Sequence, residues 1–512
     1  MKLRVVCYAV NGSGVGHLMR LCAIARWLRR YARHARARAE IYFLTSSEAD
    51  GLLFHERFAS FKLPSKTVVD DAGIDKLTYL ALAKQWVWHS LGLLRPDLLV
   101  VDSFPRGSFG ELLSALDLAR RRAFIYRPVK DDFAARADFQ AMLPLYDAIL
   151  VPEADAPVRV PPGAAGKLRH LGPVLARERC ELLGRDEARA RLGVPPDRLA
   201  VYVSAGGGGD ALAGAHLHAV AAALAGDPSL HLVVGAGPLY RGLQITGERV
   251  TWLGGQLAFP LMAGFDLAVC AAGYNTWNEL MHAGVPSLFL PQDKVADDQS
   301  GRAARAAEAG AGQLLSSIDE LPAAVAAWRQ PSRRAAASTA ARGLVPKNHA
   351  RELAAELLRL VLPASAVASA EDAVDDDLLA AAGDDLELYL DVVEALDGET
   401  ASGTSRHAVE LLGRADGEGI PRLAAQKITT LLARRLPAAR PDERAEAAAR
   451  VLAALRPFDD WGGAQSFLKV FATDARPLPD AVCDFLAGLR ARGEDLYRGI
   501  ARLSNPAPGA VA

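Results

Sequence analysis

Cysteine is scarce in this 512-residue chain: there are five, and none forms a CxxC pair or a cluster with histidines. This pattern is typical of a reducing compartment and predicts no zinc or other metal site. The sequence also lacks any apolar run approaching the ~18 residues of a membrane span, and no secretory leader precedes its first apolar segment. We therefore expect a cytoplasmic protein that is neither secreted nor membrane-spanning.

The sequence also lacks an excess of either sign of charge, because the net charge is only −1. Residues 1–370 nevertheless carry 43 basic and 35 acidic side chains, whereas residues 371–512 carry 16 and 25. The basic residues are not interleaved with aromatic ones in a recognisable module, so we do not expect nucleic-acid binding. The imbalance instead indicates two parts of different character that meet near residue 370.

The first part has the pattern of two parallel α/β domains. Each half opens with an apolar strand, a glycine-rich turn and a helical segment, and its further strands are continuous apolar runs, which suit a sheet covered on both faces. We predict strands in the first half at 3–10, 41–47, 97–103, 123–128 and 147–153, and in the second at 199–204, 231–237, 250–253, 266–273 and 286–291. The predicted domains are residues 1–160 and 161–365.

The run from Ala271 to Gly312 has an order of parts that suits a nucleotide-activated sugar. A turn at Gly273 ends a buried strand, and Asn275 and Thr276 are placed to cap a helix, whose N-terminus offers free N–H groups to phosphate. The Glu279 carboxylate follows one turn later, where it could bind the two hydroxyls of a ribose. After the next strand, Asp298 and Gln299 could bind the hydroxyls of a hexose.

Two glycine-rich loops complete the candidate site. In the second half, Ser204 and the glycines Gly206, Gly207 and Gly208 follow a strand, and a backbone without Cβ atoms can approach a pyrophosphate closely. An isolated glycine run would more often be only a flexible turn. Its position after a domain-opening strand favours phosphate contact.

The first-half loop has the pattern GxGxGH, with Gly14, Gly16 and His17, and Gly14 and Gly16 are also candidates for phosphate contact. An imidazole at such a turn can remove a proton from an acceptor hydroxyl or from water. The alternative is that His17 merely packs against the following helix. Asp102 ends an apolar strand and is the second candidate, either as a base or as the partner that orients His17, although an aspartate there can also be a simple turn former.

The segment 271–312 resembles the donor-binding signature of GT-B glycosyltransferases, particularly the peptidoglycan N-acetylglucosaminyltransferases and their bacterial relatives. The resemblance implies two Rossmann-like domains facing each other across a cleft, with the acceptor domain first and the nucleotide-sugar domain, including a crossover helix, second. It also implies an inverting transferase that needs no metal or other cofactor, because its co-substrate is a UDP-sugar resembling UDP-N-acetylglucosamine. Residues 1–365 contain no Asp-X-Asp motif that would indicate otherwise.

Residue roles follow from the same resemblance. Glu279 would hold the ribose, Asp298 and Gln299 the sugar, and the segment around Leu253 the base. The family commonly has an asparagine where this chain has Arg302, which leaves the sugar open.

Two other functions stay open. The loop GVGHLMR also resembles that of the UDP-sugar hydrolase of pseudaminic acid synthesis, in which His17 would activate water. A non-catalytic nucleotide-sugar sensor is the third hypothesis.

Partners are less defined by the sequence. The acceptor is an unknown hydroxyl compound, for which a lipid-linked molecule is one option. Peripheral contact with the inner face of the membrane could use the arginine-rich stretch 26–38 or the tryptophan-containing helix predicted at 77–94, although these are more often a solvated helix face and core. Residues 370–512 show helical patterns without strands, so we predict an α-helical accessory domain that could bind a protein partner or mediate dimer formation.

Overall fold

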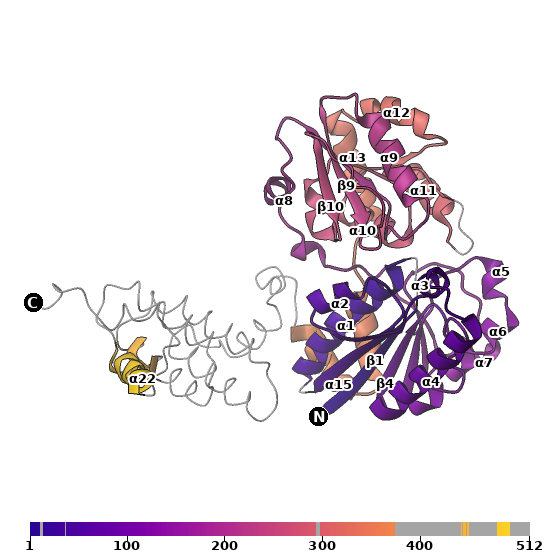
Figure 1. Ribbon diagram of the computed structural model, residues 1–512, viewed down its shortest axis with the longest axis vertical. Helices are drawn as coiled ribbons and strands as arrows, with labels where there is room; N and C mark the ends of the chain where they lie inside the picture. The colour runs from indigo at the N-terminus through magenta and orange to yellow at the C-terminus, as the bar shows by residue number, and fades with distance from the viewer. Residues whose placement is uncertain are drawn as a thin grey trace, which may run out of the picture. The chain divides into compact units, whose positions relative to one another are not determined.

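The computed structural model describes residues 1–10, 14–35, 37–255, 257–292, 297–373, 442, 444–446, 448–449 and 479–491. The chain divides into two compact units, Met1–Asp375 and Asp376–Ala512. Both predicted parallel sheets lie in the first unit (Figure 1). In the second unit the structure describes helix α22 (Asp480–Ala491), and most of the predicted α-helical domain 370–512 lies outside the described residues.

The first domain is built on a seven-stranded sheet in which every pair of neighbours is parallel, in the order β3-β2-β1-β4-β5-β6-β7. Continuous apolar runs form its central strands, as in β4, where all five residues are buried. Its strands are β1 (Lys2–Ala9), β2 (Arg38–Thr45), β3 (Ala59–Lys62), β4 (Leu98–Asp102), β5 (Arg121–Ile125), β6 (Ala148–Val151) and β7 (Leu168–His170).

Helices cover this sheet. Val87 and Leu91 of α4 pack with Val6 and Leu99 in one apolar cluster, which places α4 over one face of the sheet. The helices of this part are α1 (Gly16–His34), α2 (Gly51–His55), α3 (Lys66–Asp71), α4 (Lys76–Leu94), α5 (Asp131–Ala134), α6 (Ala137–Gln140) and α7 (Pro162–Ala165).

The second domain has a six-stranded parallel sheet in the order β10-β9-β8-β11-β12-β13. The strands are β8 (Leu199–Ser204), β9 (Leu230–Gly237), β10 (Val250–Gly254), β11 (Leu267–Cys270), β12 (Ser287–Phe289) and β13 (Gly312–Leu314). The helices are α8 (Arg185–Leu192), α9 (Ala213–Leu224), α10 (Tyr274–Ala283), α11 (Gln299–Glu308), α12 (Leu321–Ala327) and α13 (Pro331–Leu344).

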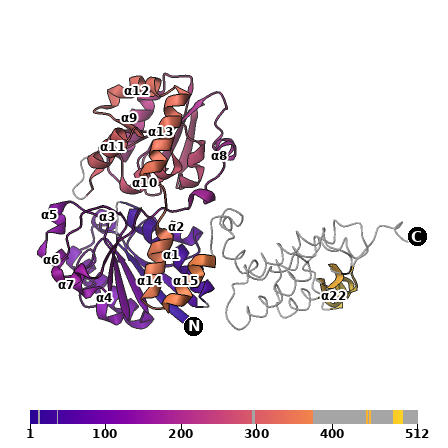
Figure 2. The same ribbon diagram turned by 180° about the vertical axis from the view of Figure 1, so that it is seen from behind.

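The chain crosses between the domains twice. After α13 it returns to the first domain, where α14 (Ala350–Arg359) and α15 (Ala364–Ala373) pack against α1 (Figure 2). β7 also belongs to the first sheet, although it lies beyond residue 160, where we placed the domain boundary from the sequence. The outgoing crossing therefore lies between β7 and α8.

Each sheet has a switch point, where the chain leaves in opposite directions from two neighbouring strands. The switch point lies between β1 and β4 in the first sheet and between β8 and β11 in the second. Open parallel sheets bind ligands outside the carboxyl ends of such strand pairs. The loops that follow β1, β4, β8 and β11 are therefore the places to look for a site.

Candidate active site

His17 and Asp102 meet at the switch point of the first sheet. His17 lies in the first turn of α1, after β1, and its Nδ1 is 3.3 Å from Oδ1 of Asp102, the last residue of β4. Both are buried, with 9% of His17 exposed and none of Asp102. With Nδ1 engaged by the carboxylate, Nε2 is the nitrogen left to accept a proton.

Arg20 holds Asp102 from the other side. Its Nε donates to Oδ2 of Asp102 at 2.8 Å, and the Ser103 hydroxyl donates to Oδ1 at 2.6 Å. Burial alone would raise the pKa of Asp102, but the Arg20 charge and the His17 hydrogen bond outweigh it and hold the pKa well below its usual range. A carboxylate held in this state orients His17 better than it removes protons.

His17 is in a suitable protonation state for a base. Burial lowers its pKa below 6.5, and the hydrogen bond to Asp102 opposes burial only in part, while the Arg20 and Arg127 charges lower the pKa further. The imidazole is therefore neutral at pH 7, as general base catalysis requires.

The glycine loop of the second domain adopts conformations that need glycine. Gly206 and Gly208 have φ angles of +65° and +78°. The Ser204 hydroxyl, buried at the end of β8, accepts a hydrogen bond from the Gly206 N–H at 3.0 Å and so fixes the turn. A Cβ on Gly208 would lie 2.1 Å from the carbonyl oxygen of Ala236. The loop therefore has a defined conformation, fixed by a hydrogen bond and by close packing, and is not a flexible turn.

Helix α10 follows β11 across the same switch point. Its N-cap is Gly273, and no side chain caps it, so the expectation that Asn275 and Thr276 cap the helix was wrong: both lie in its first turn. The reason is that the chain already turns at Ala272, which has a φ of +58° and lies one residue before the expected turn at Gly273. The free N–H groups at this end remain available to an anion.

Glu279 lies one turn further along α10. Among the described residues its carboxylate has no hydrogen-bond partner, and burial raises its pKa to about 8 against a partial opposing effect of the Arg177 charge. A partly buried carboxyl without partners is costly to ionise. Hydroxyl groups of a ligand would supply the missing donors.

The two switch points meet. A Cβ on Gly16 would lie 3.6 Å from the Asn275 side chain, and one on Gly207 would lie 3.3 Å from the Val15 backbone nitrogen, so each glycine loop faces the other domain. The Arg20 guanidinium lies over the Tyr274 ring at 5.4 Å, and the Tyr274 hydroxyl donates to the Pro152 carbonyl at 2.5 Å. The loops predicted for phosphate and the predicted base are thus brought together.

Asp298 and Gln299 occupy the start of α11. The Asp298 carboxylate caps that helix by accepting from the Gly301 N–H at 2.9 Å, and Gln299 is buried, with its side-chain oxygen accepting from the Gln292 N–H at 2.9 Å. Both side chains therefore have structural partners, which a sugar would have to share or displace.

An ion-pair cluster that the sequence does not predict lies beside them. The Asp297 carboxylate binds Arg127 of the first domain at 3.0 Å and Arg302 of α11 at 2.7 Å, and Arg302 also donates to the Ala272 carbonyl. The one available signal was that Arg302 departs from the family pattern. Leu253 ends up in β10 and is buried, while Gly14 lies just ahead of α1, half-buried.

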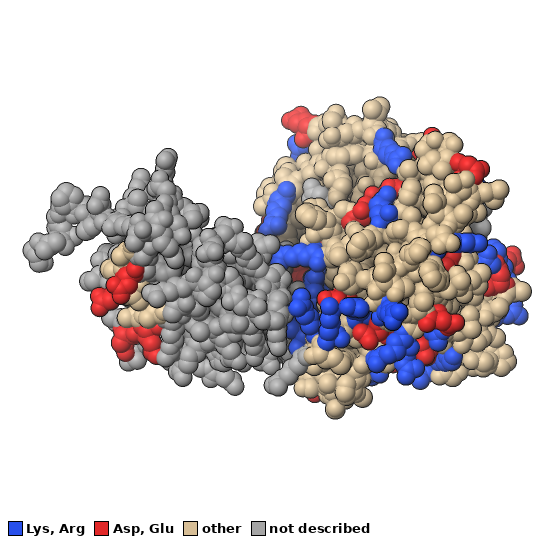
Figure 3. All heavy atoms as spheres, turned by 60° about the horizontal axis from the view of Figure 1, so that its bottom comes forward, with Lys and Arg blue, Asp and Glu red and all other residues tan. Residues whose placement is uncertain are grey.

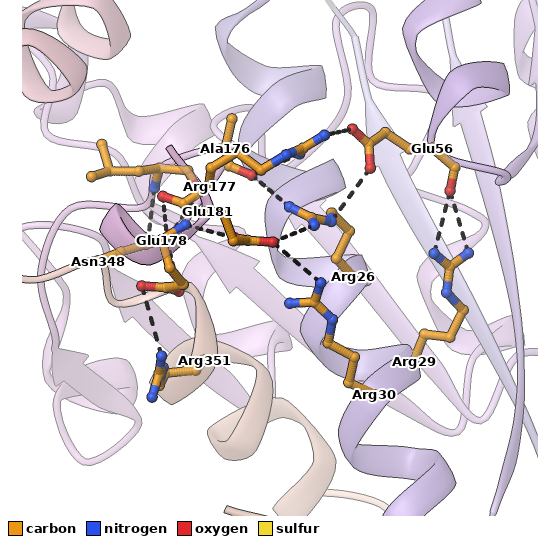
Figure 4. A network of polar contacts seen from close by, with 11 residues as sticks. Arg26, Arg29, Arg30, Glu56, Ala176, Arg177, Glu178, Glu181, Asn348 and Arg351 are labelled. Carbon is orange, nitrogen blue, oxygen red and sulfur yellow. Dashed lines mark hydrogen bonds and ion pairs between the residues drawn. The ribbon is translucent and has the colours of Figure 1, made fainter. Parts of the chain in front are cut away.

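The arginine-rich stretch has a different role from either one considered in the sequence. Arg26 and Arg30 are buried and bind Glu181 of the outgoing crossing, at 2.7 and 3.4 Å, and Arg26 also pairs with Glu56 (Figure 4). Although burial raises the pKa of Glu181, these charges lower it to about 2. This part of the stretch is therefore neither a solvated face nor a membrane surface.

Comparisons with known proteins find similarity to glycosyltransferases. Residues 258–367 match the family model described as the glycosyltransferase family 28 C-terminal domain. A UDP-N-acetylglucosamine–N-acetylmuramyl-(pentapeptide) pyrophosphoryl-undecaprenol N-acetylglucosamine transferase of Nocardioides sp. is 33% identical over 198 residues, 36% of this chain and 53% of the relative. The enzyme of the same description from Methylococcus capsulatus is 42% identical over 95 residues, 17% of this chain and 27% of the relative.

The predicted resemblance to peptidoglycan N-acetylglucosaminyltransferases is confirmed. The chain spans about half the length or less of the curated relatives named above. Among solved structures, the glycosyltransferase SnogD from Streptomyces nogalater is 17% identical, with a TM-score of 0.49 and coverage of 70% of this chain and 99% of that one.

Proposed function

We propose that the chain is a glycosyltransferase that moves a sugar from a UDP-sugar, of the UDP-N-acetylglucosamine kind, to a hydroxyl acceptor. The observation that carries the proposal is the meeting of the His17–Asp102 pair with the glycine loop and helix α10 of the second domain. The family 28 match and the activity of the relatives support the same reaction.

The proposed mechanism assigns one task to each part. Nε2 of His17 takes the proton of the acceptor hydroxyl as its oxygen attacks the anomeric carbon, and Asp102 stabilises the resulting imidazolium. Attack opposite the leaving group inverts the configuration. The leaving diphosphate is stabilised by the N–H groups at the start of α10 and in the Ser204–Gly208 loop, so this arrangement requires no metal or cofactor.

The remaining site residues hold the donor. Glu279 accepts hydrogen bonds from the two ribose hydroxyls, the segment around Leu253 contacts the base, and Asp298 and Gln299 contact the sugar. Asn275 and Thr276 lie in the first turn of α10, on the phosphate side. Gly14 and Gly16 contact the donor phosphates from the side of the first domain.

Calorimetry tests this proposal directly. The full chain is titrated with UDP, GDP, dTDP and UDP-N-acetylglucosamine, and release of UDP is then followed without an acceptor. Micromolar UDP binding with slow release is the expected result. Rapid release would support the UDP-sugar hydrolase instead, binding without turnover under any acceptor would support a sensor, and no nucleotide binding would overturn the proposal.

We also propose peripheral membrane contact through exposed apolar surface; the relatives act on an undecaprenol-linked compound. No helix in the described part of the chain is long and apolar enough to cross a membrane. Helix α4 buries the face with Ala83, Val87 and Leu91 but leaves Leu77, Leu82, Trp88 and Leu93 exposed, which offers apolar surface for such contact.

A further inference from the structure

The first domain contains a cavity of about 470 Å³ whose lining combines cations with aromatic rings. Its walls come from the loops after β1, β2 and β4, from the start of α3, and from α5, α6 and the residues between them, at the carboxyl edge of the sheet, where His17 also lies. A volume in this range suits a small molecule rather than a long lipid chain. None of the residues assigned above to the donor lines it.

The cavity adjoins the proposed base. Phe104, which lines it, follows Asp102 by two residues, and its ring centroid lies 5.5 Å from that of His17. A molecule in the cavity could therefore place a hydroxyl next to the imidazole.

Aromatic rings form one wall. Phe104 and Phe133 meet edge to face with centroids 6.4 Å apart, and Phe133 contacts Phe139 at 5.7 Å. Such spacings are those of favourable ring pairs, so a further planar ring can join them.

Cations outnumber acids among the lining residues. Arg106 and Arg136 share the single carboxylate of Asp138, at 2.7 and 3.0 Å. Lys66 has no ion-pair partner among the described residues and lies over the Phe109 ring at 4.4 Å. The lining therefore carries three cations for one carboxylate, which favours an anionic ligand.

A buried carboxylate fixes the loop that presents these groups. Glu111 is 1% exposed and accepts hydrogen bonds from the N–H groups of Ser108 and Phe109, at 2.8 and 2.6 Å, and from the Tyr8 hydroxyl. Gly107 has φ of +80°, and a Cβ there would lie 2.3 Å from the Glu111 side chain. Glu111 does not line the cavity, but its charge acts on Lys66; with Glu111 and Asp138 both counted, the three cations still outnumber the nearby carboxylates.

We infer that this cavity binds the acceptor, and that the acceptor is a hydroxylated aromatic compound carrying an anionic group. The ring packs among Phe104, Phe109 and Phe133, the anion faces Lys66, and the hydroxyl reaches His17. The inference rests on the proposed transferase function, whose donor is held by the other domain.

The test measures binding of small aryl anions to the full chain saturated with UDP. The probes are 4-hydroxyphenylacetate and phenyl phosphate, with the neutral 4-hydroxyphenylacetamide and a short polyprenyl diphosphate as comparisons. We expect at least one aryl anion to bind, about 3- to 10-fold more tightly than the amide, and Lys66→Gln to remove that preference. Comparison of the two aryl anions distinguishes a carboxylate from a phosphate.

Lys84→Gln is the matched control, because Lys84 is an exposed lysine of α4 that does not line the cavity. The inference is overturned if neither aryl anion binds, if the amide binds equally well, if Lys66→Gln changes nothing, or if only the polyprenyl diphosphate binds. UDP affinity is measured in the same samples. If the protein binds an aryl anion but does not bind UDP, the donor proposal is overturned and the cavity remains an anion site.

Discussion

Asp102 illustrates how a residue's neighbours decide its chemistry. The sequence left it as base, orienting partner or turn former, and in the structure Arg20, Ser103 and His17 all bind its carboxylate. An anion stabilised in this way has little affinity for a proton. Burial keeps His17 neutral despite its contact with Asp102, and Nε2 has no hydrogen-bond partner among the described residues, so base and orienting partner take separate roles.

The first prediction concerns His17. We expect His17→Ala to lower turnover by about 10² to 10⁴-fold and to leave UDP affinity nearly unchanged, because the imidazole acts on the acceptor. Since the pKa of His17 is lowered, the wild-type rate should stay high from pH 8 down to 6.5 and fall only below that. Normal turnover in the variant would make His17 structural.

A second prediction tests the buried pair. Asp102→Asn leaves the Arg20 guanidinium, only 2% exposed, without its anion, and should reduce the free energy of unfolding by about 3–5 kcal/mol. Adding Arg20→Met removes the stranded charge, so the double variant should be more stable than the single one. Urea unfolding followed by tryptophan fluorescence checks both. Equal losses would mean that the pair is not what stabilises this edge of the sheet.

The third prediction uses the raised pKa of Glu279. A carboxyl whose pKa rises from 4.5 to about 8 on folding binds an extra proton in the folded state, so its contribution to stability falls as pH increases between those values. Glu279→Gln should therefore raise the melting temperature relative to wild type more at pH 8.5 than at pH 5. The same variant should weaken UDP binding by about 1–3 kcal/mol, because an amide cannot accept both ribose hydroxyls equally well. Unchanged UDP affinity would remove the ribose assignment.

At the scale of elements, the loop after β8 offers a matched pair of glycines. Gly206 and Gly208 both have positive φ, but a Cβ on Gly206 meets nothing within 4 Å, whereas one on Gly208 meets the Ala236 backbone. Gly206→Ala should cost about 1 kcal/mol of stability from its backbone conformation alone. Gly208→Ala should cost more and also weaken UDP binding, because the loop must move. Thermal unfolding and calorimetry of both variants check this, and equal effects would show that packing against β9 does not fix the loop.

The sequence predicted the strands that carry long apolar runs, and every predicted strand has a counterpart in the two sheets. It did not predict β3, β7 and β13, which have three or four residues each, lie at sheet edges and contain no buried residue. So short a segment has no periodicity to detect. Their position is set by pairing with a neighbour that the sequence pattern does not show.

The sequence likewise predicted some residues of the candidate site and not others. His17, Glu279 and the glycines lie in the loop after a strand or in the first turns of the helix that follows, and they could be found because the motifs coincide with the ends of predicted strands. The Arg127–Asp297–Arg302 cluster could not, because it joins residues 170 positions apart in sequence and depends on how the domains meet. Positive φ at Ser103 and Ala272 was equally hidden, since neither residue type suggests it.

At the scale of the whole molecule, basic and acidic side chains are mixed over the face shown in Figure 3, so the excess of basic residues in the first part does not form one uninterrupted patch there. Several of these cations are paired, as in Lys2 and Arg4 with Glu40 and in Arg122 with Asp147. Electrostatic attraction of this face to anionic lipids should therefore be weak, and membrane contact would depend mainly on apolar surface.

The fifth prediction concerns the compact unit Met1–Asp375. It contains both sheets and the returning helices α14 and α15, so its core does not need the rest of the chain. We expect a protein truncated after Asp375 to unfold cooperatively and to bind UDP within about 3-fold of the full chain, as measured by calorimetry. A large loss of affinity would assign residues 376–512 a part in the donor site.

The double crossing makes the second domain an insertion within the first. Its two connections are tied side by side, because Asn348 on the way back accepts a hydrogen bond from the Leu175 N–H and donates to Glu178 on the way out (Figure 4). A protease that nicks either connection would leave the halves attached through the other. Permuted chains that begin in the second domain should likewise keep both sheets intact, because two chain connections, rather than a single hinge, join the domains.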